Sequence, residues 1–96
     1  MLVVTRGANG AVAWTRDAKV EVPGIPTTVV DTVGAGDSFQ AALLAWFDER
    51  DLLSEAALAA LDRAKLREVV QFAVMAAAIT CSRAGADLPR RNELPR

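Results

Sequence analysis

The chain of 96 residues contains no histidine, one cysteine and few aromatic residues, which make up 5% of it. The lack of histidine excludes a histidine general base and a metal centre with histidine ligands. The lone cysteine, Cys81, excludes an internal disulfide and favours a reducing compartment, so we expect a cytoplasmic protein. Because Cys81 lies in an apolar stretch, we expect it to be a small core residue.

The net charge of the chain is small, and the sequence lacks long apolar runs. The formal net charge is −1 and the isoelectric point is about 5.3, so no basic patch favours nucleic acid as a partner. No apolar run reaches the roughly 18 residues that indicate a membrane-spanning helix. Met1 leads directly into the apolar run Leu2–Val4, so we expect neither a signal peptide nor a membrane partner.

Apolar residues are abundant instead and form 52% of the chain. A domain of this size cannot bury that much apolar surface by itself. Part of this surface is therefore expected to pack against other strands of a longer protein or against a partner.

The first third of the sequence predicts strands. Short apolar or alternating runs at residues 2–5, 11–15 and 19–22 are typical of strands, and Val29 and Val30 predict a last short one. The turn after the first run contains Asn9-Gly10, a strong hairpin signal, and residues 23–26 predict a loop.

From Gly36 the apolar period becomes that of a helix. One apolar stripe is matched by further apolar residues on the opposite side, which predicts a helix buried almost all round. The stripe consists of Phe39, Ala42, Leu43, Trp46 and Phe47, and the opposite side carries Ala41, Leu44 and Ala45. Trp46, Phe47 and Trp14 are expected to be core residues rather than ligand platforms.

Two more helices are expected in the second half. A short helix would run from an N-cap at Ser54 to Leu61, and a longer one from about Leu66 to Ser82. Gly85 is a natural C-cap for the longer helix, and the tail at residues 87–96 is expected to run over the surface.

The stretch from Asp31 to Phe39 is the most informative part of the chain. It reads Asp-Thr-Val-Gly-Ala-Gly-Asp-Ser-Phe and predicts a glycine-rich turn that opens a helix with Asp37 at its start. Backbone N–H groups at a helix N-terminus lack intrahelical partners and attract anions. A carboxylate there can accept the proton of a hydroxyl that attacks a bound phosphoryl group. Two structural alternatives stay open: Asp37 can simply complement the helix dipole, and the glycines can form a plain strand-to-helix turn.

This stretch resembles the second conserved motif of the ribokinase-like (PfkB-type) carbohydrate kinases, because it matches their pattern D-[TS]-x-[GA]-A-G-D-x-F. The segment Val3–Gly10 is similar to the strand-and-turn nucleotide segment of that family, and Thr80–Ala86 is similar to its closing loop. Within the family, the sequence of residues 30–44 and 77–86 most resembles that of bacterial fructokinases.

The resemblance implies an α/β fold, namely the C-terminal portion of a ribokinase-like doubly wound sheet. The N-terminal strand would join a central parallel sheet, the next two strands would form an edge hairpin, and two or three helices would follow. Residues 1–96 would then be the C-terminal segment of a longer kinase, incomplete as a domain, with the N-terminal sugar-binding part and the lid absent. For a complete chain, strands followed by helices would instead suggest an α+β layout.

The resemblance also implies catalytic roles. Asp37 would be the general base, and Gly34, Ala35 and Gly36 would form the anion hole in which backbone N–H groups converge on the transferred phosphoryl group. Phosphoryl transfer depends mostly on positioning and charge stabilisation, which such a hole supplies.

A second set of residues would contact ATP by the same resemblance. These residues are Thr5, Gly7 and Gly10, where glycine lets the backbone approach a phosphate or ribose and the threonine hydroxyl can bond to a phosphate oxygen. The residues alone favour a simpler interpretation, a hairpin turn around Asn9-Gly10.

Asp31 has two interpretations. It can end the preceding strand by accepting bonds from backbone N–H groups, as aspartate commonly does. By resemblance, it would instead help to hold a monovalent cation such as K⁺ beside the anion hole. Backbone carbonyls of Val33, Thr80, Arg83 and Gly85 would be the other ligands.

The implied activity is transfer of the γ-phosphoryl group of ATP, with Mg²⁺ bridging the phosphates, to fructose, giving fructose 6-phosphate. One alternative is the same chemistry on ribose, 2-keto-3-deoxygluconate or a nucleoside. Another is a non-catalytic remnant that only packs against a partner. The isolated chain is expected to be inactive, and to form a homo-oligomer or to associate with the missing N-terminal part.

Overall fold

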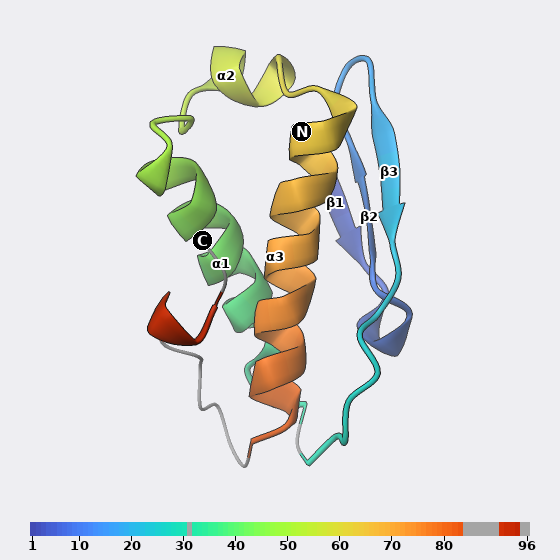
Figure 1. Ribbon diagram of the computed structural model, residues 1–96. Helices are drawn as coiled ribbons and strands as arrows, with labels where there is room; N and C mark the ends of the chain where they lie inside the picture. Colours follow the sequence, from blue (N-terminus) through green and yellow to red (C-terminus); the bar gives the residue numbers. More distant parts are fainter. Residues whose placement is uncertain (31, 84–90, 95–96) are drawn as a thin grey trace.

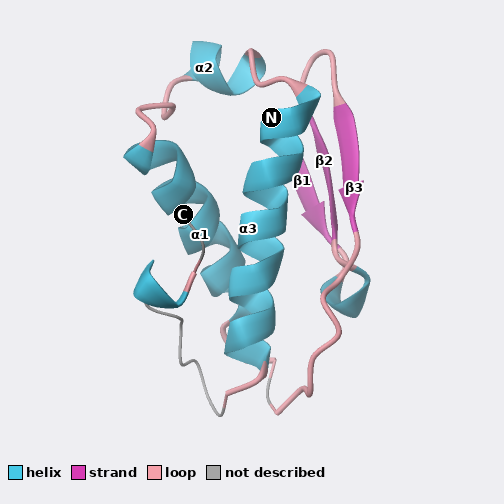
Figure 2. Cartoon of the chain, in the orientation of Figure 1, coloured by secondary structure: helices cyan, strands magenta, loops and turns pink. Residues whose placement is uncertain are grey.

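The computed structural model describes residues 1–30, 32–83 and 91–94. A three-stranded sheet lies on one side, helix α3 (Arg63–Cys81) lies beside it, and helix α1 (Ala35–Glu49) lies beyond α3 (Figures 1 and 2). The short helix α2 (Glu55–Ala59) connects α1 to α3 across one end of the pair. The architecture is α/β, as expected, with α3 between the sheet and α1.

The sheet consists of β1 (Leu2–Thr5), β2 (Ala11–Trp14) and β3 (Lys19–Val22), in the order β1-β2-β3 with both pairs antiparallel. The short 3-10 turn η1 (Gly7–Asn9) joins β1 to β2. The three predicted strands in this region are confirmed, although the second ends one residue early. In the register, Ala11 stands opposite both Thr5 and Val22, so β2 is the central strand.

Polar side chains cap the two later helices. The hydroxyl of Ser54 accepts a hydrogen bond of 3.1 Å from the N–H of Ala57, which confirms the predicted N-cap of α2. A carboxylate oxygen of Asp62 accepts a bond of 2.8 Å from the N–H of Lys65. Because Asp62 caps the helix, α3 begins at Arg63, three residues before the predicted start, and this cap was not recognised in the sequence.

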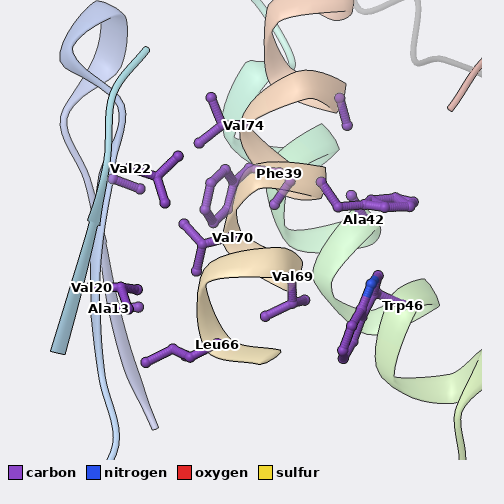
Figure 3. Close-up of a cluster of buried hydrophobic side chains, with 14 of the residues drawn as sticks. Ala13, Val20, Val22, Phe39, Ala42, Trp46, Leu66, Val69, Val70 and Val74 are labelled. Atoms are coloured by element: carbon purple, nitrogen blue, oxygen red, sulfur yellow. The ribbon is translucent and has the colours of Figure 1, made fainter. Parts of the chain in front are cut away.

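The core lies on both sides of α3 (Figure 3). On one side, Leu66 and Val70 face the buried residues of the sheet, and on the other side Val69 faces Trp46 of α1. Trp46 and Phe47 are both buried, with ring centroids 5.4 Å apart in an edge-to-face arrangement. Their predicted core role is confirmed, whereas Trp14 is only half-buried.

Helix α1 is not buried all round, and that prediction was wrong. Its apolar stripe does face the core, but Ala41 and Leu44 on the opposite side are exposed, Leu44 to 51%. The reason is that α3 is the element against which α1 packs extensively among the described residues, and α3 covers only one side of α1.

The segment at Val29 and Val30 is not a strand, so the predicted fourth strand was also wrong. The N–H of Val30 instead donates a hydrogen bond of 2.8 Å to the carbonyl of Cys81 at the end of α3. Both valine side chains are exposed. Two β-branched residues predicted a strand, but no described strand lies beside them to pair with.

The C-terminal end of α3 also differs from expectation. The helix ends at Cys81 with Ser82 as its C-cap, and the predicted cap Gly85 lies outside the described residues. Of the tail, residues 91–94 are described and include the short turn η2 (Arg91–Glu93). Leu94 is half-buried and packs against the core, so this part of the tail does not simply run over the surface. No helix in the described part is long and apolar enough to span a membrane.

Candidate functional site

A pocket of about 440 Å³ opens where four segments meet: the turn after β1, the loop after β3, the start of α1 and the C-terminal half of α3. Thr5, Gly7 and Gly10 line it from the first segment, and Ala35 and Gly36 line it from the third. The three residues predicted to contact ATP and two of the three predicted anion-hole residues therefore line the same pocket.

One wall of the pocket is made by two backbones that nearly touch. Gly10 has a φ of +87°, and a Cβ added to it would lie 1.9 Å from the carbonyl oxygen of Val22. A Cβ added to Gly24 would lie 1.9 Å from the carbonyl oxygen of Ala8. Neither position can therefore carry a side chain unless the turn and the loop move apart.

Gly7 differs from Gly10 in this respect. Its φ is +56°, and a Cβ added there would meet no atom within 4 Å. Gly7 thus leaves open space beside the pocket, whereas Gly10 is required for packing of backbone on backbone. Sequence reasoning grouped the two glycines together and did not single out Gly24.

The start of α1 presents unpaired backbone donors. Gly34 is the N-cap, with a φ of 82° and no side-chain cap bond. The N–H of Ala35 donates to the carbonyl of Thr32 at 3.3 Å, and the N–H of Ser38 donates to the carbonyl of Gly34 at 2.9 Å. The N–H groups of Gly36 and Asp37 have no acceptor among the described residues. These two groups, at the positive end of the helix dipole, are the ones available to an anion.

Asp37 lies in the first turn of α1, directly after Gly36, and is exposed. It does not line the pocket, so its carboxylate lies outside the pocket wall that Gly36 helps to form. The next residue, Ser38, is buried, and its hydroxyl donates a hydrogen bond of 3.2 Å to the carbonyl of Ala76 in α3. This bond ties the start of α1 to α3.

The residues predicted to hold a cation are only partly described, because Asp31 and Gly85 lie outside the described residues. Thr80 was expected to lie in a loop, but it lies in the last turn of α3. The helix continues to this point through the alanine-rich run. Its carbonyl accepts a bond of 3.1 Å from the N–H of Arg83, and the guanidinium of Arg83 pairs with Glu93. Val33 is exposed just before α1.

The α3 wall of the pocket was missed by sequence reasoning. Cys81 is half-buried and lines the pocket, so the expectation of a plain core residue was wrong. Val74, Ala77 and Ala78 line the same wall. The signal was the helical spacing of the small residues Ala77, Ala78 and Cys81, which leaves room beside one face of the helix.

Comparison with known proteins identifies relatives. The sequence profile of the pfkB family carbohydrate kinases matches residues 1–93. A fructokinase from Rhizobium leguminosarum bv. trifolii is 49% identical over 67 residues, which are 70% of this chain and 21% of that protein. The crystal structure of a fructokinase from Xylella fastidiosa with bound ATP is 31% identical, with a TM-score of 0.79 over 88% of this chain and 26% of that one. A ribokinase from Thermotoga maritima is 29% identical, with a TM-score of 0.74 over 95% of this chain and 27% of that one.

The chain spans about a quarter of the length of these relatives. Within that span, the match to solved structures confirms the expected fold, a portion of a ribokinase-like α/β domain. The profile match covers the sheet, the glycine-rich start of α1 and all of α3, so the sequence and the architecture agree. The chain belongs to the pfkB family of carbohydrate kinases.

Proposed function

We propose that this chain supplies the nucleotide-binding and catalytic-base part of an ATP-dependent fructokinase. The observation that carries the proposal is the single pocket in which Thr5 and Gly7 meet the start of α1, directly before Asp37. The relatives from Rhizobium leguminosarum and Xylella fastidiosa are both named fructokinases, which favours fructose over ribose or a nucleoside as the acceptor.

The chemistry follows from the positions of the donors and of the carboxylate. ATP would occupy the pocket, and the free N–H groups of Gly36 and Asp37 would donate to the transferred phosphoryl group. The sugar hydroxyl oxygen forms a bond to the γ-phosphorus, the bond from that phosphorus to the leaving oxygen of ADP breaks, and the hydroxyl proton passes to the Asp37 carboxylate. Because Asp37 is exposed and outside the pocket lining, the sugar approaches from outside the pocket.

The proposed reaction would use two cations. Mg²⁺ bound to the ATP phosphates would neutralise the charge that develops during transfer. A monovalent cation such as K⁺ would sit at the C-terminal end of α3, where the last carbonyls carry partial negative charge. Thr80 fits this role, because its buried hydroxyl has no hydrogen-bond partner in the described part of the chain. Val33 and Arg83 would add carbonyl ligands, and Asp31 and Gly85 complete the proposed set.

We also propose that the chain works in the cytoplasm as part of a larger kinase assembly. Leu2 and Val4 are exposed to 60% and 42% on the face of the sheet that points away from α3. On its outer side, β1 pairs with no strand in the described part of the chain. The sugar-binding part of the kinase, or a second copy of the chain, would cover this surface.

The experiment is a chimera in which the N-terminal three-quarters of the Rhizobium fructokinase is fused to this chain. Coupled assays of ADP release should show phosphorylation of fructose. Replacing Asp37 by asparagine should lower kcat by at least about 100-fold, the low end of general-base contributions. Asp48→Asn is the matched control, because Asp48 is an exposed carboxylate at the other end of α1, and its kcat should not change.

The outcomes separate the parts of the proposal. A folded Asp37→Asn chimera that keeps full turnover would show that Asp37 is not the base. Phosphorylation of ribose but not of fructose would overturn the choice of acceptor. A folded chimera that phosphorylates no sugar would favour the non-catalytic remnant.

A further inference from the structure

Among the described residues, the side chains that line the pocket are apolar or carry a hydroxyl or a thiol, and none of them is charged or an amide. On the helical wall, these are Phe39 of α1 and Val74, Ala77, Ala78 and Cys81 of α3. Adenine and guanine differ in which edge atoms donate and accept hydrogen bonds, and this difference is read by amide and charged side chains or by backbone N–H and C=O groups. The helical wall can therefore recognise a base only by its shape and its apolar area.

Several backbone carbonyls around the pocket already accept hydrogen bonds. The carbonyl of Ala78 accepts the N–H of Ser82 at 3.1 Å, and the carbonyl of Cys81 accepts the N–H of Val30 at 2.8 Å. On the opposite wall, the carbonyl of Gly10 accepts the N–H of Arg6 at 2.7 Å. Each of these three carbonyls thus already accepts one hydrogen bond, which leaves the two walls fewer backbone groups to read the edge of a base.

The remaining polar side chains in the lining are three threonines, Thr5, Thr27 and Thr32. None of their hydroxyls bonds to another residue in the part of the chain that the structure describes. A hydroxyl can rotate to donate or to accept a hydrogen bond. It therefore serves an amino group and a carbonyl group equally well and does not select between adenine and guanine.

We propose that this pocket, as the nucleotide site of the proposed kinase, accepts guanine as well as adenine, so that both purine nucleoside triphosphates serve as phosphate donors. The inference rests on the proposed function. A site built to hydrogen-bond one substrate rejects an analogue that lacks the bonding group by about 10⁴-fold. An apolar pocket without such groups discriminates only by the area that the ligand fills, so a single-ring pyrimidine binds more weakly than either purine.

The experiment is a nuclear magnetic resonance titration of the 96-residue chain with ADP, GDP and UDP in the presence of Mg²⁺. The dissociation constants of ADP and GDP should agree within about 5-fold, and that of UDP should be at least about 5-fold higher, because less apolar area is buried. Shifted resonances should include those of Ala77, Ala78 and Cys81, which line the pocket from α3.

A pair of variants tests whether the base enters the pocket. Ala78→Leu fills part of the pocket. It should raise the dissociation constants of ADP and GDP by the same factor, at least about 10-fold, because both bases lose apolar contact. Ala64→Leu is the matched control, because Ala64 is exposed near the start of the same helix and does not line the pocket. It should leave both affinities unchanged, and thermal melts should show that both variants are folded.

Three results would overturn the inference in distinguishable ways. Binding of ADP with GDP weaker by more than about 30-fold would show that the backbone of residues 25–29 reads the base edge, and would leave the proposed kinase intact. Equal binding of all three nucleotides, unchanged in Ala78→Leu, would show that only the phosphates are bound. No binding of any nucleotide by the folded chain would overturn the nucleotide site itself, and the proposed function with it.

Discussion

The buried hydroxyl of Ser38 donates a hydrogen bond of 3.2 Å to the carbonyl oxygen of Ala76, 38 residues further along the chain. The bond joins the first turn of α1 to α3, one residue after the proposed base. Replacing Ser38 by alanine should lower the free energy of unfolding by about 1 kcal/mol, a typical contribution of a hydrogen bond of this kind. Urea denaturation measures the change, with Gln40→Ala as the control.

Gln40 is exposed on the same helix, so its replacement should change the free energy of unfolding by less than about 0.5 kcal/mol. In the chimera, Ser38→Ala should also lower kcat, because the turn that carries Asp37 loses its tie to α3. Equal stability of Ser38→Ala and the parent chain would show that the bond contributes nothing.

The two glycines of the turn after β1 should respond differently to alanine. Gly10→Ala should destabilise the chain by more than about 2 kcal/mol, because the new Cβ collides with the carbonyl of Val22 and the φ of +87° is strained. Gly7→Ala should cost only about 1 kcal/mol, the penalty of a left-handed conformation without a collision. Thermal melts followed by circular dichroism measure both. The reverse order would contradict the backbone contact at Gly10.

Leu66 and Leu44 form a matched pair for the core. Leu66 is fully buried between the sheet and α3, whereas Leu44 is 51% exposed on the outer side of α1. Leu66→Ala should lower the free energy of unfolding by about 2 to 5 kcal/mol, because it leaves a cavity. Leu44→Ala should change it by less than about 1 kcal/mol. A large loss from Leu44→Ala would mean that the outer side of α1 is covered in solution.

Cys81 is the only cysteine, and it lines the pocket while remaining half-buried. Its thiol should therefore react with a maleimide, and ATP or ADP should slow the reaction, because the nucleotide covers the wall that carries it. Mass spectrometry measures the rate. The control carries Ala64→Cys with Cys81→Ala, which moves the thiol to an exposed site, and its rate should not depend on nucleotide. Protection of both thiols would reveal a non-specific effect.

The exposed face and outer edge of β1 should make the isolated chain associate. Light scattering should show dimers or larger species, because Leu2 and Val4 leave apolar side chains uncovered. Replacing both by lysine should restore a monomer, since charge on an edge strand opposes pairing. Lysine at Ala64 and Gln71, both exposed on α3, adds the same charge elsewhere and should leave association unchanged. A monomeric parent chain would contradict the prediction.

The local patterns predicted the elements that depend on their own residues. The alternating run at Lys19–Val22 became β3, and Ser54 became the N-cap of α2, because pleating and capping act over a few neighbours. The glycine-rich run also opened α1 at the predicted place. In each case, the physical cause lies within a few residues of the effect.

The errors concern features that depend on distant parts of the chain. Val29 and Val30 have strand propensity but no neighbouring strand, and the N–H of Val30 bonds to the end of α3 instead. Glycine is required at position 24 because the backbone carbonyl of Ala8, 16 residues earlier in the chain, lies against it. Such a contact between distant residues leaves no local pattern in the sequence. Cys81 appeared to belong to the core because its neighbours are apolar, but the small residues beside it leave a pocket.

The bond from Val30 to Cys81 has a consequence for synthesis of the protein on the ribosome. The pocket needs the last turn of α3, which is translated after the sheet, after α1 and after α2. At a synthesis rate of about 5 to 20 residues per second, the apolar face of the sheet stays uncovered for roughly a few seconds until α3 has been made. The nascent chain therefore offers that face to chaperones before it can offer a site to a nucleotide, so nucleotide binding cannot assist the earliest steps of folding.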